Sequence, residues 1–219
     1  MKNYIKHFYA ATILFVAFVF WTSIVKFVDV QAIGPNGSAV GLATINRLFH
    51  NLTGANLALY LITDWLGLVP IAVALGFAVL GLIQWIKRKS ICKVDLDIIF
   101  LGVFYIVCAM VYLLFEKVVI NYRPVIIEGF LEASYPSSTT LLVACFMPTA
   151  IMQFNWRISN KKVKSALTII SILFIAFMII GRLISGVHWL SDILGGLLIS
   201  GALVLFYYSI CAIREKKAK

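Results

Sequence analysis

The sequence predicts an all-α integral membrane protein, a bundle of six transmembrane helices with a further helix in an outer loop. Three observations support this prediction. The 219-residue chain is 62% hydrophobic and 13% charged, with a mean hydropathy of +0.99, whereas soluble domains are roughly half apolar and about a quarter charged. Its apolar residues form stretches long enough to cross a bilayer. Short basic runs separate these stretches, as in the cytoplasmic loops of membrane proteins.

The N-terminal apolar run lacks a small-x-small cleavage site and is long enough to span, which favours an uncleaved first helix over a signal peptide. After it, Gly34-Pro35-Asn36-Gly37 ends any helix, and the weakly amphipathic residues 40–62 predict a helix lying in the membrane interface. No internal repeat or soluble domain is visible, so residues 1–219 are expected to form one membrane-embedded domain. The six spans are expected at residues 8–27, 66–86, 97–115, 138–156, 165–181 and 192–213.

The distribution of lysine and arginine predicts the orientation. With the N-terminus inside, 14 of the 19 basic residues fall in inner segments, as the positive-inside rule requires. Both termini are therefore expected in the cytoplasm, and a bacterial cell membrane is expected for so compact a chain. The net charge of +10 is divided among these loops, so it does not indicate nucleic-acid binding. The inner basic residues are Lys2, Lys6, Lys87, Arg88, Lys89, Lys93, Arg157, Lys161, Lys162, Lys164, Arg214, Lys216, Lys217 and Lys219.

Three cations on the opposite face need another explanation. Lys117 and Arg123 follow the third span, and Arg182 ends the fifth. A charge so close to hydrocarbon is unfavourable unless it has a partner. A single such arginine usually anchors lipid headgroups, but these three share their face with the Pro136-Ser137-Ser138-Thr139 segment and with His188 and Asp192. The combination favours an anion site.

Phosphoryl transfer is the chemistry that these residue types can perform. Arginine and lysine bind phosphate oxygens, and backbone amides near Ser137 and Ser138, at the start of a helix, favour an anion. His188 can attack phosphorus as a neutral imidazole. Asp192 lies four residues later, on the same face of a helix, where its carboxylate can orient the imidazole. A His-x3-Asp pair in isolation is more often a local hydrogen bond.

The pattern resembles the type-2 phosphatidic acid phosphatase family, which shares its catalytic core with vanadium haloperoxidases. That family carries a lysine before Arg-Pro, then Pro-Ser-Gly-His, then Ser-Arg-x5-His-x3-Asp. Arg182, His188 and Asp192 match the third motif. The resemblance implies that His188 forms a phosphohistidine, that Asp192 orients it, and that the reaction needs no metal or other cofactor. It also implies that the phosphate is bound by Arg123, Arg182, Ser137, Ser138 and Lys117.

Four positions depart from the family pattern, one of which is Ser138 in the place of the glycine of the second motif. Gly181 stands where the family has serine. Lys117 is one residue closer to Arg123 than usual, and one residue is about 100° of rotation on a helix, which puts its contact with phosphate in doubt. Thr139 takes the place of the histidine that protonates the leaving group. Thr139 therefore marks the region of the missing acid, for which Glu128 and Glu132 are candidate replacements, although both are more simply explained as solvated loop acids.

Loss of that acid predicts a substrate preference. General-acid catalysis contributes about 10²–10⁴ in rate, and a diphosphate needs it least because its leaving group is a stable phosphate anion. The expected function is a membrane lipid phosphatase acting at the outer face on a lipid phosphate or, by preference, on a polyprenyl diphosphate such as undecaprenyl diphosphate. Two alternatives stay open: a lipid phosphotransferase of the same family, and a catalytically silent lipid-binding or transport protein.

Overall fold

The apolar segments fold as long helices in a computed structural model that describes residues 3–217 of the backbone and residues 5–212 of the side chains. Lys2 and Lys219 lie outside the described residues, as do the side chains of Arg214, Lys216 and Lys217. The α-helices are α1 (Asn3–Phe27), α2 (Ala43–Thr53), α3 (Leu57–Leu66), α4 (Leu68–Arg88), α5 (Leu96–Lys117), α6 (Ser138–Arg157), α7 (Lys161–Ile184) and α8 (Leu190–Lys217), and short 3-10 turns η1 (Pro35–Gly37) and η2 (Ile91–Lys93) lie in the loops.

Five segments in the described part of the chain are long and apolar enough to cross a membrane, one fewer than expected. The predicted fourth span corresponds to α6, which begins at the expected residue but is more polar than the others. Its polar groups are satisfied inside the bundle. Thr149 donates to the carbonyl of Cys145 at 3.0 Å, and Gln153 donates to the hydroxyl of Tyr207 at 2.7 Å. A helix enclosed by other helices needs less apolar surface than one that faces lipid.

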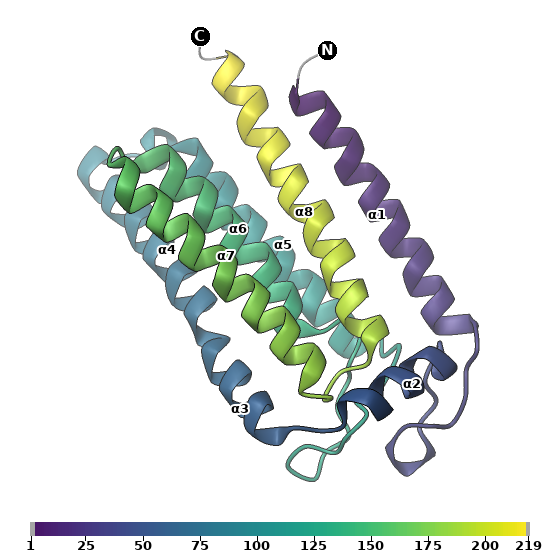
Figure 1. Ribbon diagram of the computed structural model, residues 1–219. Helices are drawn as coiled ribbons and strands as arrows, with labels where there is room; N and C mark the ends of the chain where they lie inside the picture. The colour runs from purple at the N-terminus through teal and green to yellow at the C-terminus, as the bar shows by residue number, and fades with distance from the viewer. Residues whose placement is uncertain (1–2, 218–219) are drawn as a thin grey trace.

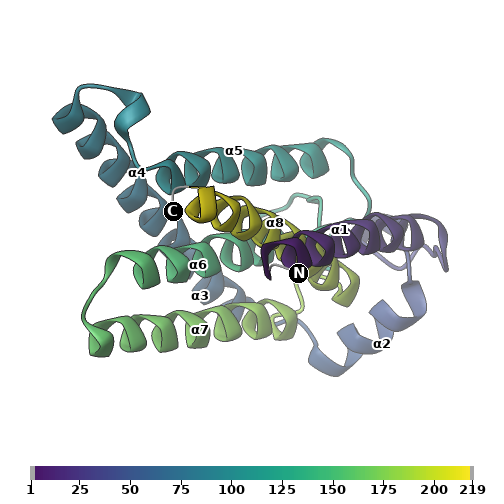
Figure 2. The ribbon, with the colours of Figure 1, turned by 90° about the horizontal axis from the view of Figure 1, so that it is seen from above.

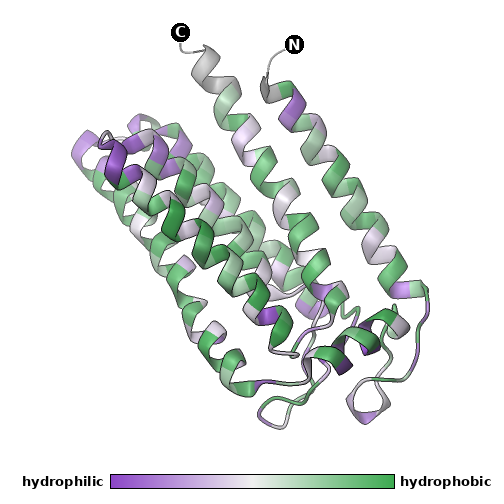
Figure 3. Cartoon of the chain, viewed as in Figure 1, coloured by the Kyte–Doolittle hydropathy of each residue, from purple (hydrophilic) through white to green (hydrophobic). Residues whose placement is uncertain are grey.

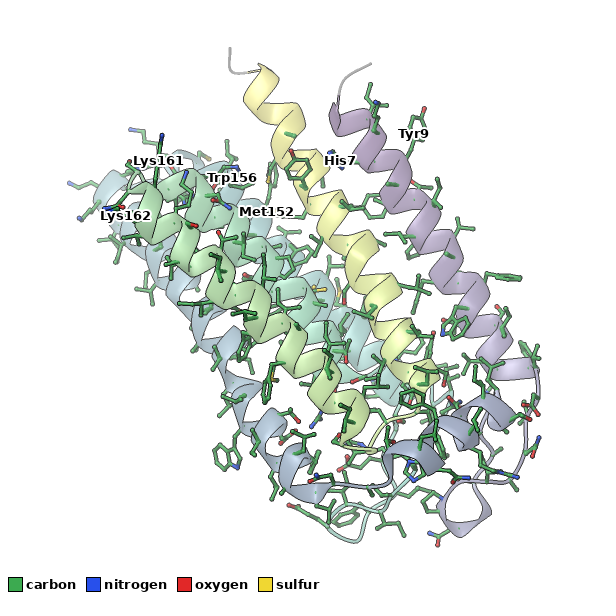
Figure 4. The ribbon with its side chains drawn as sticks, in the orientation of Figure 1. His7, Tyr9, Met152, Trp156, Lys161 and Lys162 are labelled. Carbon is green, nitrogen blue, oxygen red and sulfur yellow. The ribbon has the colours of Figure 1, made fainter. Side chains whose placement is uncertain are left out.

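The helices form a bundle around α6, which packs against α4, α5, α7 and α8 (Figures 1 and 2). The first and last helices, α1 and α8, lie side by side, and both termini leave the bundle at one end. Hydrophilic residues gather at the ends of α4 to α7 that lie on the same side of the bundle as the termini, where the sequence has its basic runs (Figure 3). Lys161 and Lys162 lie at the end of the bundle that holds the termini (Figure 4). The structure thus groups the basic segments at one end.

The segment predicted as one interfacial helix forms two helices. The chain turns at Gly54, and the Asn56 side chain caps α3 by accepting from the amide of Leu59 at 3.0 Å. α3 then continues through Gly67 into α4, so that residues 57–88 form one apolar segment of 32 residues. α2 crosses the end of the bundle opposite the termini (Figure 1). The prediction of a single helix over residues 40–62 was wrong because the capping signal at Asn56 divides the segment.

The loops at this second end hold the expected site residues. The α5–α6 loop, residues 118–137, runs beside the short α7–α8 connection. The two are joined by hydrogen bonds: the indole of Trp189 donates to the carbonyl of Tyr122 at 2.7 Å, and the amide of Ser137 donates to the carbonyl of Asp192 at 3.1 Å. A β-carbon added to Gly195 would lie 2.5 Å from the ring of Tyr135, so this glycine permits the close packing expected for α8.

Candidate active site

His188 lies in the connection between α7 and α8, where it is buried. Its Nδ1 is 3.2 Å from the backbone carbonyl of Ser134 and 3.1 Å from the hydroxyl of the same residue. A carbonyl oxygen can only accept a hydrogen bond, so these contacts favour the tautomer with its proton on Nδ1. Nε2 then carries the lone pair, and it is buried without a hydrogen-bond partner in the described structure. An oriented imidazole with a free, unprotonated Nε2 is the form that a nucleophilic histidine requires.

Asp192 lies in the first turn of α8 and is fully buried. Its Oδ2 is 3.9 Å from Nδ1 of His188, beyond hydrogen-bonding distance. The same oxygen accepts hydrogen bonds from the hydroxyl of Ser134 and, at 2.9 Å, from the amide of Trp189. The expected direct contact between the carboxylate and the imidazole is therefore replaced by one that passes through Ser134.

Two asparagine side chains hold the Asp192 carboxylate and the start of α8 in position. Asn121 donates to Asp192 Oδ1 at 3.4 Å and accepts from the amide of Gly41 at 3.0 Å. Asn46 of α2 donates to the hydroxyl of Ser191 at 2.9 Å and accepts from the amide of Ser191 at 3.1 Å. Both asparagines are fully buried. Their hydrogen bonds connect the loops and α2 to the start of α8, which fixes the position of Asp192.

Arg123 is buried at the start of the α5–α6 loop. Its Nη2 is 3.0 Å from a carboxylate oxygen of Glu132, and its backbone amide donates to the carbonyl of the same residue at 3.1 Å. Nε and Nη1 are buried and have no hydrogen-bond partner within the described residues. A buried guanidinium with two free donors is unfavourable without an acceptor, which is the condition that a phosphate would relieve.

Arg182 reaches the same region from α7 and is 1% exposed. It binds α3: Nη2 is 3.3 Å from Asp64 Oδ1, and Nη1 is 3.4 Å from both the carbonyl of Tyr60 and the hydroxyl of Thr63. Its Nε is buried without a partner. The guanidinium carbons of Arg123 and Arg182 lie 5.9 Å and 4.9 Å from the centre of the Tyr60 ring, so one aromatic ring contacts both cations.

The environment of His188 keeps its imidazole neutral. Burial, together with the positive charges of Arg123 and Arg182, lowers the pKa of His188 to about 4, against the opposing effect of Asp192. Arg123 and Arg182 come from separate segments, contact the same Tyr60 ring and lie near enough to His188 for their charges to lower its pKa.

The start of α6 adjoins the cluster. The Ser137 hydroxyl caps the helix, accepting from the amide of Thr140 at 3.4 Å and from its hydroxyl at 3.1 Å. The amides of Ser138 and Thr139 belong to the first turn, whose N–H groups have no acceptor within the helix. In this conformation Ser137 contributes to the site as a cap, while the two free amides can face an anion.

The other predicted site residues lie farther out. Lys117 is exposed at the end of α5 and forms no salt bridge within the described part of the chain. Glu128 is exposed at the tip of the α5–α6 loop, with a positive φ of 51°. Glu132 pairs with Arg123. The structure therefore joins only Glu132 of these three to the cluster.

Ser134, Tyr60 and Asp64 are site residues that the sequence did not reveal. Ser134 contacts a histidine 54 residues away, and Tyr60 and Asp64 meet Arg182 across about 120 residues. No spacing rule connects such positions. In the part of the chain that the structure describes, no three His, Cys, Asp or Glu side chains are grouped in a way that could hold a metal ion.

Fold and site together define an integral membrane protein in which two buried arginines accompany a buried histidine. The chain belongs to the PAP2 superfamily, which matches residues 6–215. Among solved structures it is similar to the crystal structure of the first transmembrane PAP2 type phosphatidylglycerolphosphate phosphatase from Bacillus subtilis, with 20% sequence identity and a TM-score of 0.58 over 94% of this chain and 97% of that chain. No curated protein matches the sequence. The resemblance noted in the sequence is thus confirmed at the level of the family, and the structural likeness confirms the fold.

Proposed function

We propose that the protein is a membrane phosphatase that hydrolyses a lipid phosphate or diphosphate through a phosphohistidine at His188. The observation that carries this proposal is the free Nε2 of His188, buried close to two arginines that each keep at least one guanidinium nitrogen without an acceptor. A phosphate placed between them would satisfy these donors and bring phosphorus to the nucleophile. Membership of the PAP2 superfamily supports the same reaction class.

The reaction would proceed in two in-line displacements. Nε2 attacks phosphorus and the lipid leaves, while Nδ1 keeps its proton and donates a hydrogen bond to the Ser134 carbonyl. The positive charge that develops on the ring is stabilised by Asp192 through the Ser134 hydroxyl. Arg123, Arg182 and the amides at the start of α6 stabilise the equatorial oxygens in both steps. Water then attacks the phosphohistidine and releases phosphate. The guanidinium groups provide the charge neutralisation, so this mechanism needs no metal.

We place the site at the outer face of the membrane. It lies at the end of the bundle opposite the basic segments, and the positive-inside rule puts those segments in the cytoplasm. α6 joins the two ends and is enclosed by four other helices, so we propose that it is the sixth crossing. A lipid of the outer leaflet would then bring its headgroup to His188.

The substrate class depends on how the leaving group departs. Thr139 cannot act as an acid near neutral pH, and for that reason the sequence favours a diphosphate such as undecaprenyl diphosphate over phosphatidic acid. This preference holds if no other proton donor lies on the leaving-group side. Equal or faster hydrolysis of phosphatidic acid by the purified protein would overturn it.

A lipid-binding protein without activity is the second candidate, and the absent motif histidine is the observation that favours it. The geometry around His188 argues against it. Binding an anion requires cations and amides, whereas the arrangement of Ser134 and Asp192 serves only to set the tautomer and orientation of the imidazole. Phosphate release distinguishes the two candidates.

The experiment uses detergent-purified full-length protein and a panel of lipid phosphates and diphosphates. The wild type is expected to release phosphate and to retain a phosphoryl group that is lost in acid and kept in base, as a phosphohistidine is. His188→Ala should abolish both signals, while His7→Ala, in α1 beside Tyr208, should leave both intact. Phosphate release by His188→Ala at the wild-type rate would refute the proposal, and a phosphorylated acceptor would instead identify a phosphotransferase.

A further inference from the structure

A cavity of about 370 Å³ lies between α4, α5 and α6 next to the site. Its walls are mostly apolar, and Leu68, Ile71 and Tyr112 are between 41% and 53% exposed on the surface that faces lipid. Its polar lining includes Ser138 and Thr139 at the start of α6, and its charged lining residue is Asp64. The cavity thus joins lipid-facing surface to the position where the family has its acid histidine.

Asp64 is placed here by the packing of α3 on α7. Its carboxylate contacts Arg182 at 3.3 Å, while its side chain remains 52% exposed. A β-hydroxyl at position 181 is excluded by this packing, because even a β-carbon there would lie 2.8 Å from a methyl group of the buried Thr63. Gly181, which replaces the serine of the family pattern, thus permits the close approach of α3 that brings Asp64 to Arg182.

We propose that Asp64 is the proton donor to the leaving group, in place of the histidine that Thr139 replaces, and that the enzyme therefore accepts lipid phosphate monoesters. This inference rests on the proposed function. A phosphate bound by Arg182 would lie beside Asp64, because both would contact the same guanidinium. If the ester oxygen of this phosphate faced the cavity, it would lie next to the Asp64 carboxyl group. The cavity lining contains no cation to stabilise a phosphate leaving group, which is a second argument for an alcohol.

The proton balance is complete without another reactant. A phosphate monoester ionises for the second time near pH 6, so it can bring a proton into the site. A phosphate bound by Arg182 can pass this proton to the Asp64 carboxylate, which contacts the same guanidinium. In the first step Asp64 gives the proton to the ester oxygen as the P–O bond breaks and the P–N bond forms, leaving an alcohol, a carboxylate and a phosphohistidine. In the second step the carboxylate takes a proton from the attacking water, and phosphate and neutral His188 are regenerated.

Three other groups are poorer donors. Thr139 has an aliphatic hydroxyl, which is not acidic near neutral pH. Tyr112 lines the cavity, but a phenol ordinarily ionises near pH 10, far from the operating range. Glu132 pairs with the other arginine, Arg123, and does not line the cavity. Asp64 alone combines a carboxyl group, a contact with a phosphate-binding arginine and a place on the cavity wall.

The test compares an alkyl lipid phosphate with an aryl phosphate, whose phenolate leaves readily without a proton. Asp64→Asn is expected to lower kcat on the alkyl phosphate by about 10²-fold or more and kcat on the aryl phosphate by less than about tenfold. Asp64→Glu should restore part of the alkyl activity. Phosphohistidine formation from the aryl phosphate reports that the variant is folded.

Glu132→Gln is the matched control, because it removes the carboxylate partner of the other arginine. We expect it to change both substrates in the same proportion. If Asp64→Asn also lowers both in equal proportion, or neither, Asp64 is not the donor, and the phosphatase assignment still stands on the wild-type activity. A wild type that hydrolyses neither substrate and forms no phosphohistidine overturns the proposed function itself.

Discussion

His188 and Asp192 are connected through Ser134. The carboxylate lies 3.9 Å from Nδ1, and the Ser134 hydroxyl contacts both groups. In addition, the Ser134 carbonyl accepts from Nδ1 at 3.2 Å. The backbone carbonyl of Ser134 therefore fixes the tautomer of His188. The Ser134 side chain forms a hydrogen-bonded bridge between the imidazole and the Asp192 carboxylate. The orientation of the imidazole depends on the α5–α6 loop as much as on α8.

Ser134→Ala should reduce kcat by about tenfold to a hundredfold with KM nearly unchanged. A hydrogen bond to a charged group contributes about 1.5–3 kcal/mol, and this one is needed most when the ring becomes positive. The carbonyl contact survives, so the tautomer and some activity remain. Single-turnover formation of phosphohistidine measures the effect directly.

Ser209→Ala is the control for that variant. Ser209 is also buried, but its hydroxyl donates to the carbonyl of Leu205 within α8, and it should leave kcat unchanged. Because Ser134 and Asp192 act on the ring as one unit, adding Ser134→Ala to Asp192→Asn should cause little further loss. Independent, multiplicative losses would show that the two residues do not act together.

Much of the fold follows from local sequence properties. α6 begins at Ser138, as expected, because Ser137 caps it and the apolar run begins there. Hydropathy did not foresee how buried α6 is, since burial by other helices is a tertiary property. Local sequence properties mark the division between α2 and α3 only weakly, because residues 40–62 contain no proline and the break depends on Gly54 and on the Asn56 cap.

The site residues also divide into those that the sequence predicts and those that only the structure reveals. His188 and Asp192 were predicted from a four-residue spacing on an assumed helix, whereas the structure places His188 before the start of α8, in the connection from α7. Ser134 and Asp64 were not predicted, because their contacts with His188 and Arg182 are made between segments far apart in the chain. Glu128 and Glu132, which lie near the motifs in sequence, were predicted as possible replacements for the missing acid. Of these two residues, only Glu132 contacts an arginine. Nearness in the chain does not determine which acid lies on the leaving-group side.

The pH dependence should differ from that of an ordinary histidine. Burial and the two arginines lower the pKa of His188 to about 4, below its usual value of about 6.5. The free enzyme therefore keeps a neutral nucleophile down to about pH 4, and protonation below that value stops the reaction. After correction for the substrate's own ionisation, kcat/KM should lose activity near pH 4. An acidic limb near pH 6.5 would contradict the buried, uncharged environment.

The bound phosphate should shift that limb. A dianion close to the imidazole favours its protonated form, so the acidic limb of kcat, which reports the enzyme–substrate complex, should lie at a higher pH than that of kcat/KM. Arg123→Gln removes one positive charge that acts on His188 and should move the acidic limb of kcat/KM upward as well. A profile of kcat/KM that is identical in the variant and the wild type would show that Arg123 does not influence the imidazole.

Arg182→Lys should lower kcat/KM by about tenfold to a hundredfold, even though the charge is kept. Arg182 directs Nη2 to Asp64 and Nη1 to both Tyr60 and Thr63 while its Nε remains free, and a lysine ammonium cannot make this set of contacts. Arg47→Lys is the control, because Arg47 is exposed and contacts Gln31 at 3.2 Å. Inhibition by inorganic phosphate should weaken with Arg182→Lys and stay the same with Arg47→Lys.

Gly181→Ser, which restores the serine of the family pattern, should lower the stability of this protein. A β-carbon at 181 would lie 2.8 Å from the methyl group of Thr63, which is fully buried and donates to the carbonyls of Leu59 and Tyr60 at 2.9 Å. Thr63 cannot rotate away without breaking these hydrogen bonds, so α3 must move. Overpacking of this kind costs about 1–3 kcal/mol, which should appear as a lower midpoint of thermal unfolding in detergent.

The same displacement should separate Asp64 from Arg182, so Gly181→Ser should lose more activity on an alkyl phosphate than on an aryl phosphate. Gly76→Ser provides the matched control, because a β-carbon at position 76 of α4 would meet no atom within 4 Å. It should change neither the unfolding midpoint nor the ratio of the two activities. If Gly181→Ser keeps the wild-type ratio although its unfolding midpoint falls, the position of α3 affects stability without determining the proton donor.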